Sequence, residues 1–223
     1  YQMVCLATKS FLDNSYVKKN LAKNEEAFDH YLYNLDYNKT LMTQKQLDSL
    51  LFFKQNFYNN LSSSGILLSI LSKKMINDNI TKIKELINTK INNKNDLLIN
   101  IQIETDPKKK IFVKDDNELF LRWIEKMSLD IIYHAYQLQK AKNDLKTEEA
   151  IQKAIPIVKN KMLTQLDKLY NENFDYFFQL FIDGVLGAQD PHSVLFIGQK
   201  KTNFFKSFKT ELETFGIVYQ INE

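Results

Sequence analysis

Glycine and proline are scarce in this chain: five glycines and three prolines occur in 223 residues. A protein of strands and tight turns needs more of both, because these residues supply much of the backbone geometry of turns. Apolar residues instead recur every three or four positions through most of the sequence, which is the spacing of amphipathic helices. The sequence therefore predicts a mainly α fold, a multi-helix orthogonal bundle.

Hydrophobic residues make up 44% of the chain and charged residues 26%, which is enough apolar material for a packed core. The longest apolar runs, such as residues 65–71, fall far short of the roughly 20 residues that span a bilayer. We therefore expect a folded protein with no transmembrane segment. The chain begins with Tyr1 rather than methionine, so we interpret it as a piece of a longer protein, and no signal peptide is recognisable at its start.

Helix boundaries follow from capping residues and breakers. Asn24 is expected to cap one helix, Thr43 to begin a second, and Asp115 or Asp116 to cap the helix after the interruption at 92–116. The run 62–65, which ends in a glycine, is expected to separate the second helix from the third. Pro156 predicts either a kink or a helix boundary near residue 155, and Gly187 is expected to end a helix. The expected helices are 24–35, one from 43 to the break at 62–65, 66–91, 116–142, one from 147 that meets Pro156, 173–186 and 199–214. The second of these is expected to turn Leu51 inward, among others, and the helix 173–186 is expected to carry a dense face of mainly phenylalanine side chains.

Two segments depart from the helical pattern. Residues 92–116 contain an alternating stretch, Leu97–Ile103, and then Asp106-Pro107, which does not fit inside a helix, so we expect a long extended arm there. Residues 215–221 alternate like a β-strand, and a lone strand has no sheet to join in a helical domain. We therefore place a domain boundary here, with a helical domain at 1–214 and the first strand of a following domain at 215–223.

Composition argues against several classes of function. The net charge is +3 and is spread along the chain, and Arg122 is the only arginine among 30 basic residues, so a nucleic-acid partner is not expected. Cys5 is the only cysteine and cannot form an intramolecular disulfide. Phosphate-binding glycine loops, metal-ligand spacings and nucleophile elbows are absent from the sequence. We expect no catalytic residue, no metal and no cofactor in this chain.

One motif deserves comparison with a catalytic triad, because Asp190, His192 and Ser193 occur within four residues. Residues so close in sequence cannot place a carboxylate, an imidazole and a hydroxyl in a relay. We interpret Asp190 as a helix cap, Pro191 as a first-turn residue, and the other two as partners of local backbone groups.

Four segments together resemble one family. Residues 27–39 are similar to an F-x-x-Y-L-x-x-L-D-Y opening, and 106–126 are similar to an extended arm that leads into an N-E-x-E-L-x-x-L-W-x-x-K helix. Asp190-Pro191-His192-Ser193 resembles a D-P-H-S/T signature, and Phe215-Gly216-Ile217 follows at a similar spacing in place of G-I-G. The order and spacing resemble the N-terminal helical region of the tail-specific, or carboxy-terminal processing, proteases in their long periplasmic form.

The resemblance implies a fold and a role. In the family, a PDZ domain and then a serine protease domain with a Ser/Lys pair follow the helical region, so the catalytic residues would lie outside these 223 residues. The chain would be a non-catalytic scaffold and regulatory domain that packs on those two domains and docks a helical-repeat lipoprotein adaptor. The full enzyme would act on periplasmic or envelope proteins with apolar C-termini, and the location would be the periplasm or envelope.

Structural roles are expected for a few residues. Asp190, Pro191, His192, Ser193 and Gly216 would fix the junction with the PDZ domain, Asp36 and Tyr37 would hold the first turn between helices, and Trp123 would belong to the arm-and-helix motif. The alternative is a stand-alone helical interaction or surface protein with no protease activity.

Overall fold

The computed structural model describes residues 1–14, 23–57, 61–92, 94–97, 103–104, 106–141, 144–190, 192–196 and 198–207. Over these residues the chain is mainly α, as predicted, and forms a bundle of eight α-helices and two short 3₁₀ helices. The α-helices are α1 Gln2–Asn14, α2 Lys23–Leu35, α3 Gln44–Leu50, α4 Leu61–Lys90, α5 Asp116–Ala141, α6 Thr147–Tyr170, α7 Phe174–Gln189 and α8 Gly198–Ser207, and the 3₁₀ helices are η1 Leu51–Asn56 and η2 Lys94–Asp96. No helix of the described part is long and apolar enough to cross a membrane.

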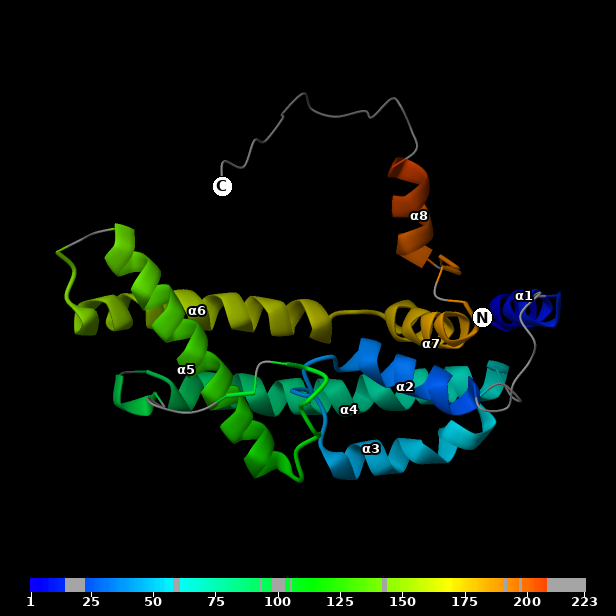
Figure 1. Cartoon of the computed structure of the whole chain (residues 1–223), viewed down its shortest axis with the longest axis horizontal. Coiled ribbons are helices and arrows are strands. Elements are labelled where there is room, and N and C mark those ends of the chain that lie inside the picture. Colours follow the sequence, from blue (N-terminus) through cyan, green and yellow to red (C-terminus); the bar gives the residue numbers. More distant parts are fainter. Residues whose placement is uncertain are drawn as a thin grey trace.

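Helix α4 is the longest element of the bundle. Its 30 residues extend over about 45 Å at 1.5 Å per residue. Helices α6 and α7 follow each other along it, α5 crosses α6 obliquely, and α2 packs against α7 (Figure 1). Helices α2 and α7 therefore share the centre of the domain with α4, although they are far apart in sequence.

The most apolar element is α7, and most of its side chains are buried. The Phe181 ring lies 4.8 Å from the Phe57 ring and 6.5 Å from the Tyr31 ring, measured between centroids. The hydroxyl of Tyr31 donates to Ser72 Oγ at 2.8 Å, which satisfies the one polar atom of that buried side chain. Burial raises the pKa of Tyr31 well above its ordinary value, so the phenol stays protonated. The dense aromatic face predicted for this helix is the centre of the core.

Gly65 and Gly187 lie within helices, although the sequence predicts that each lies at a helix boundary. The predicted break at 62–65 is wrong, because α4 already begins at Leu61. Gly65 lies inside that helix and faces Phe181, where a Cβ would approach ring atom Cδ1 to 2.7 Å. Gly187 does not end α7 either, since the helix continues to Gln189. At position 65 the missing side chain makes room for an aromatic ring, which the sequence alone does not reveal.

Other boundaries differ in detail. Helix α2 begins at Lys23, so Asn24 lies in its first turn rather than at its cap. The helix expected from residue 43 to the break at 62–65 is observed as α3 followed by η1, and Leu51, predicted to point inward, is 41% exposed. Thr43 does cap α3, in a reciprocal capping box with Gln46. Helix α6 continues through Pro156, which decides against a helix boundary there.

The interruption before α5 is present, but parts of it lie outside the described residues. Residues 98–102, most of the stretch predicted to be extended, are among those not described, and η2 precedes them. Val113 forms an isolated parallel bridge with Thr43. Asp115 caps α5, because its Oδ1 accepts from the backbone N–H groups of Asn117 and Glu118 at 3.0 and 3.1 Å. The predicted strand 215–221 and the last residues of the expected helix 199–214 also lie outside the described part.

Candidate structural and interdomain sites

The predicted site residues fall into two separate places. Asp36 and Trp123 meet where the arm, residues 106–113, packs on the turn after α2, and we call this place the arm anchor. Asp190, His192 and Ser193 form a turn at the end of α7. Pro191 and Gly216 lie outside the described residues.

Asp36 organises the turn between α2 and α3. Its carboxylate is 3% exposed and accepts three backbone hydrogen bonds, from Thr40 N at 2.8 Å, Leu41 N at 2.9 Å and Met42 N at 3.0 Å. Burial raises the pKa of Asp36, and the three N–H donors and the nearby Arg122 guanidinium oppose that rise. One carboxylate thus satisfies three N–H groups that would otherwise be buried without partners.

Trp123 joins helix α5 to the same turn. Its indole Nε1 donates to the carbonyl oxygen of Thr40 at 2.7 Å, while Thr40 N donates to Asp36. The two predicted residues are therefore connected through one threonine. Tyr37 lies beside them in sequence but is 44% exposed, and its ring packs edge-on against Tyr33 with centroids 4.7 Å apart.

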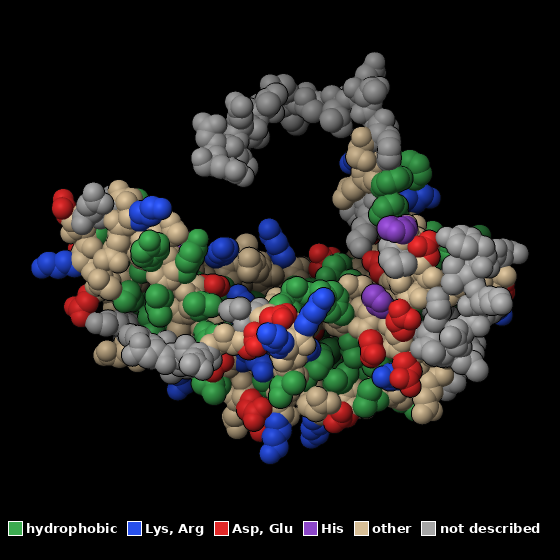
Figure 2. All heavy atoms as spheres, in the orientation of Figure 1, with side chains coloured by type: hydrophobic (Ala, Val, Ile, Leu, Met, Phe, Trp, Pro, Cys, Tyr) green, Lys and Arg blue, Asp and Glu red, His purple; other side chains and the backbone are tan. Residues whose placement is uncertain are grey.

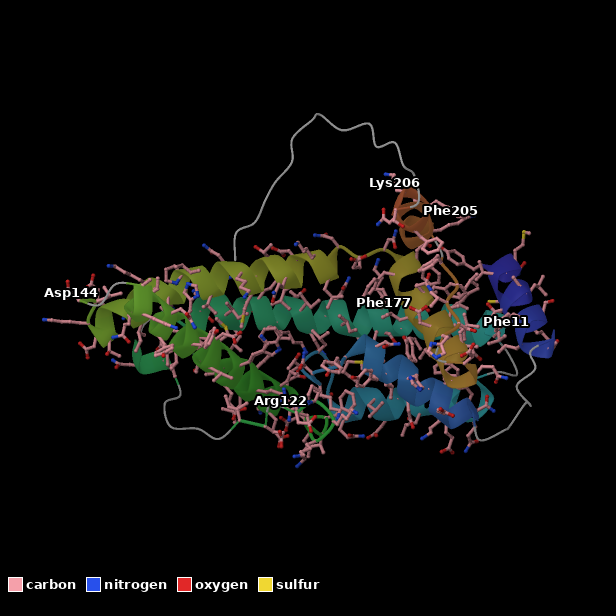
Figure 3. The ribbon with its side chains drawn as sticks, turned by 45° about the horizontal axis from the view of Figure 1, so that its top comes forward. Phe11, Arg122, Asp144, Phe177, Phe205 and Lys206 are labelled. Carbon is pink, nitrogen blue, oxygen red and sulfur yellow. The ribbon has the colours of Figure 1, made fainter. Side chains whose placement is uncertain are left out.

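Two cations that the sequence analysis did not select fasten the arm. Arg122, at the start of α5 (Figure 3), donates from Nη1 to the carbonyl oxygens of Lys39 and Ile111, each at 2.8 Å. Lys39 adopts a left-handed backbone conformation, with φ at 53°, and its ammonium donates to the carbonyl oxygens of Pro107 and Lys110. The turn, the arm and α5 are thus bound together by side chains that reach backbone carbonyls.

A buried pair of amides supports the anchor from α4. Asn79 Nδ2 donates to the Leu41 carbonyl oxygen at 2.7 Å and to Gln46 Oε1 at 2.8 Å. Gln46 is also the residue that completes the capping box of α3. Among the anchor residues that the sequence analysis did not select, Arg122 is distinguished in the sequence as the only arginine of the chain.

At the end of α7 the chain turns back on itself. The Asp190 carboxylate accepts from His192 N at 3.0 Å and from Ser193 Oγ at 2.8 Å, and these two hydrogen bonds, the backbone one first, lower the pKa of Asp190. Asp190 is the C-cap residue of α7, and Pro191, interpreted as a first-turn residue, lies outside the described residues. His192 and Ser193 are expected from the sequence to be partners of local backbone groups, whereas the His192 N–H and the Ser193 hydroxyl both bind the Asp190 carboxylate.

Residues 192–196, which we call the strap, run back along α7. Gln179 on α7 is 2% exposed and donates from Nε2 to the Leu195 carbonyl oxygen at 2.6 Å and to Asp183 Oδ1 at 2.7 Å. Farther on, Gly198 has a φ of 53° and lies so close to Asp175 that a Cβ would come within 2.9 Å of Oδ2. The sequence analysis missed Gln179, because a glutamine on an apolar helix gives no sign of its distant partner.

Helix α8 starts from this strap. Its Phe204 ring stacks on Phe196 of the strap, with centroids 4.5 Å apart and an interplanar angle of 28°. The helix projects from the body of the bundle (Figure 1), and its side chains from Lys201 to Ser207 are exposed. The strap therefore determines where the chain emerges after α7.

Among the residues that the structure describes, no group of three or more His, Cys, Asp or Glu side chains could hold a metal ion. The anchor cations bind backbone carbonyls, and the Asp190 turn presents its carboxylate to its own neighbours. The fold and the two sites define a helical domain whose polar side chains serve architecture.

A comparison with protein families identifies the family to which this helical domain belongs. Residues 8–197 match the family described as the tail specific protease N-terminal domain. The match covers most of the 223 residues, so the chain belongs to this family. A search of curated proteins finds no match.

Proposed function

We propose that this chain is the non-catalytic scaffold and regulatory domain of a serine endopeptidase that recognises the C-terminal tails of its substrates. Membership of the tail-specific protease N-terminal domain family carries the proposal. The domain would occupy residues 1–214, and 215–223 would begin the first strand of a PDZ domain. A protease domain with a Ser/Lys pair would follow and supply the chemistry.

The strap and α8 support a role in packing against further domains. Phe204 and Phe205 on α8 are 39% and 57% exposed, and Phe205 projects from the helix (Figure 3). A short helix with exposed aromatic side chains gains stability when a partner covers them. The PDZ domain, which would begin a few residues later, is the partner that we propose for this face.

The remaining parts of the proposal rest on the family alone. The enzyme would act in the periplasm or cell envelope on proteins with apolar C-termini, and a helical-repeat lipoprotein adaptor would dock on the helical domain. Proteolysis of envelope proteins would be its task.

The test is to separate the domain from the proposed catalytic part and then recombine them. We would measure cleavage of a peptide with an apolar free C-terminus by this chain, by the longer product of its parent gene, and by the part of that product after residue 214. We expect cleavage only where the protease domain is present, and binding of the separate 223-residue chain to that catalytic part. Cleavage by the 223-residue chain alone would overturn the non-catalytic role.

A matched pair of substitutions tests the packing face. Phe205→Ser should weaken binding between the two parts about tenfold or more, because an exposed aromatic side chain is a common anchor of interfaces. Phe52→Ser removes an aromatic side chain that is 79% exposed on η1 and should leave binding unchanged. Equal effects of the two variants would contradict the proposed face, and no binding at all, together with a parent gene that ends after residue 223, would favour a stand-alone interaction protein.

A further inference from the structure

A second apolar stripe runs along α5 on the side opposite the core. Leu129, Ile132, Tyr133 and Tyr136 follow the i, i+3, i+4, i+7 spacing that places side chains on one face of a helix. They are 44%, 38%, 63% and 59% exposed. Hydrophobic side chains gather over this part of α5 on the face shown in Figure 2.

The fold does not need this stripe for its own core. The opposite face of α5 already supplies buried side chains to the bundle, namely Leu119, Trp123, Met127, Ser128, Ile131 and Ala135. A helix that is apolar on two faces has a second surface to cover. Tyrosine suits such a surface, because its ring can be buried while its hydroxyl remains hydrated.

The stripe has charged residues of opposite sign at its two ends. One helical turn before Leu129 lies Glu125, and one turn after Tyr136 lies Lys140. No ion pair joins either side chain to another described residue, although Glu125 also interacts electrostatically with Arg122, one turn earlier on the same helix. The neighbouring Lys126 and Asp130, by contrast, are already paired with each other at 3.3 Å within the helix.

The pattern of these residues along α5 is self-complementary: it matches a second copy of the same helix that runs antiparallel to the first. The midpoint between Leu129 and Tyr136 is also the midpoint between Ile132 and Tyr133, and between Glu125 and Lys140. If a second α5 lies antiparallel about that point, each leucine faces a tyrosine, the central residues face each other, and each glutamate faces a lysine. A twofold interface requires such self-complementarity.

We propose that two copies of this chain associate through an antiparallel pairing of their α5 helices, centred between Ile132 and Tyr133. The apolar stripe forms the middle of the interface, and two Glu125–Lys140 ion pairs close its ends. This interface is distinct from the face of α8 proposed for the PDZ domain, and its test is independent of protease activity.

The interface is small, so the association should be weak. Four apolar side chains per copy lie along about 11 Å of helix, and the charged residues at the ends extend the contact to about 22 Å. A contact of this length buries less than the roughly 1,200 Å² of total area below which weak, transient complexes fall. We expect dissociation in the range of about 10–500 µM. Analytical ultracentrifugation of the 223-residue chain at rising concentration and low salt is the direct measurement.

Charge reversal tests the register. The variants Glu125→Lys and Lys140→Glu each place like charges at both ends of the interface, and each should raise the dissociation constant about tenfold or more. An equimolar mixture of the two variants restores opposite charges at both ends, so heterodimers should form with nearly the wild-type affinity. The double variant E125K/K140E should also dimerise like the wild type.

Removal of the apolar contact needs a folded variant and a control. Tyr133→Gln with Tyr136→Gln replaces two exposed rings by good helix formers and should abolish dimerisation while the circular dichroism stays unchanged. Leu67→Gln changes a side chain that is 49% exposed on α4 and should leave dimerisation intact. A wild-type chain that remains monomeric at about 1 mM, which is above the expected range of dissociation constants, would overturn the proposal. Single variants whose mixture associates no better than either alone would also overturn it.

Discussion

The indole nitrogen of Trp123 and the carboxylate of Asp36 act on opposite sides of a single peptide residue, Thr40: the tryptophan binds its carbonyl oxygen at 2.7 Å, and the aspartate binds its N–H at 2.8 Å. These two residues are 87 positions apart in the sequence. The turn after α2 and the start of α5 are therefore fixed relative to each other through backbone groups rather than through apolar contact alone.

Trp123→Phe should destabilise the domain by about 1–3 kcal/mol, because the Thr40 carbonyl oxygen loses its buried partner. Urea unfolding followed by circular dichroism measures the change, with the m-value expected to stay constant. Tyr133→Phe, which removes only an exposed hydroxyl, serves as the control and should change stability by less than about 0.5 kcal/mol. Equal effects of the two substitutions would show that the indole hydrogen bond is not the source of the lost stability.

Asp36 should give the domain a distinct pH dependence. Burial holds its folded-state pKa above the ordinary 3.8, so the folded carboxyl keeps a proton at pH values where the unfolded one has released it. The free energy of unfolding contributed by this group therefore falls as pH rises from about 3.8 through the raised pKa. Asp36→Asn should remove this component when unfolding is measured from pH 3 to 7.

The same substitution should also lower stability throughout. An asparagine keeps one acceptor oxygen but presents an NH2 group in place of the other, so at least one of the N–H groups of Thr40, Leu41 and Met42 loses its acceptor, which should cost about 1–3 kcal/mol. A pH slope of the opposite sign in the wild type, lost in the variant, would mean that the backbone donors outweigh burial at this carboxyl.

The pKa shift of Asp190 has the opposite sign to that of Asp36. Its pKa lies below the ordinary 3.8 because His192 N–H and the Ser193 hydroxyl bind the ionised form. The stability that it contributes is present above its unfolded-state pKa and is lost as pH falls through the lower folded-state value. Carbon-13 NMR of the two carboxyls should therefore find one midpoint on each side of 3.8.

Two variants separate the sources of the Asp190 shift. Ser193→Ala removes a hydrogen bond and should move the Asp190 midpoint upward. His192→Ala retains the backbone N–H, the larger contributor, and should move it less. An equal shift in both would assign the effect to the imidazole.

Two helical glycines should respond to alanine with opposite signs. Gly65→Ala forces a Cβ into the Phe181 ring and should destabilise by about 1–3 kcal/mol. For Gly187→Ala the nearest atom considered is His30 Nδ1 at 4.0 Å, so the better helix propensity of alanine should stabilise by about 0.5–1 kcal/mol. Thermal unfolding of both variants gives the comparison, and stabilisation at position 65 would contradict the close packing there.

The helices could be predicted because their signals are local. Apolar spacing along α5 and α7, the capping threonine at 43 and the aspartate at 115 all act within a few residues. The exact ends of α4 and α7 could not be predicted, because Gly65 and Gly187 look like helix breakers until the tertiary packing around them is known.

Among the site residues, those with partners nearby in the sequence could be predicted and those with distant partners could not. Asp36 could be found from its turn and Asp190 from its motif, since their partners lie within six residues. The partners of Lys39 and Arg122 include carbonyl groups 68 to 83 residues away, and Gln179 binds a carbonyl that carries no side-chain signal. Hydrogen bonds to distant backbone atoms leave no pattern in a sequence.

The packing of α2 against α7 has a consequence for biosynthesis. About 140 residues separate the end of α2 from the start of α7. At ribosomal speeds of about 5–20 residues per second, the apolar face of α2 is therefore without its partner for roughly 7–30 s. During that interval Phe28 and Tyr31, which are fully buried in the finished domain, are available to any chaperone or to neighbouring nascent chains. The domain should therefore complete its folding only after α7 has left the ribosome.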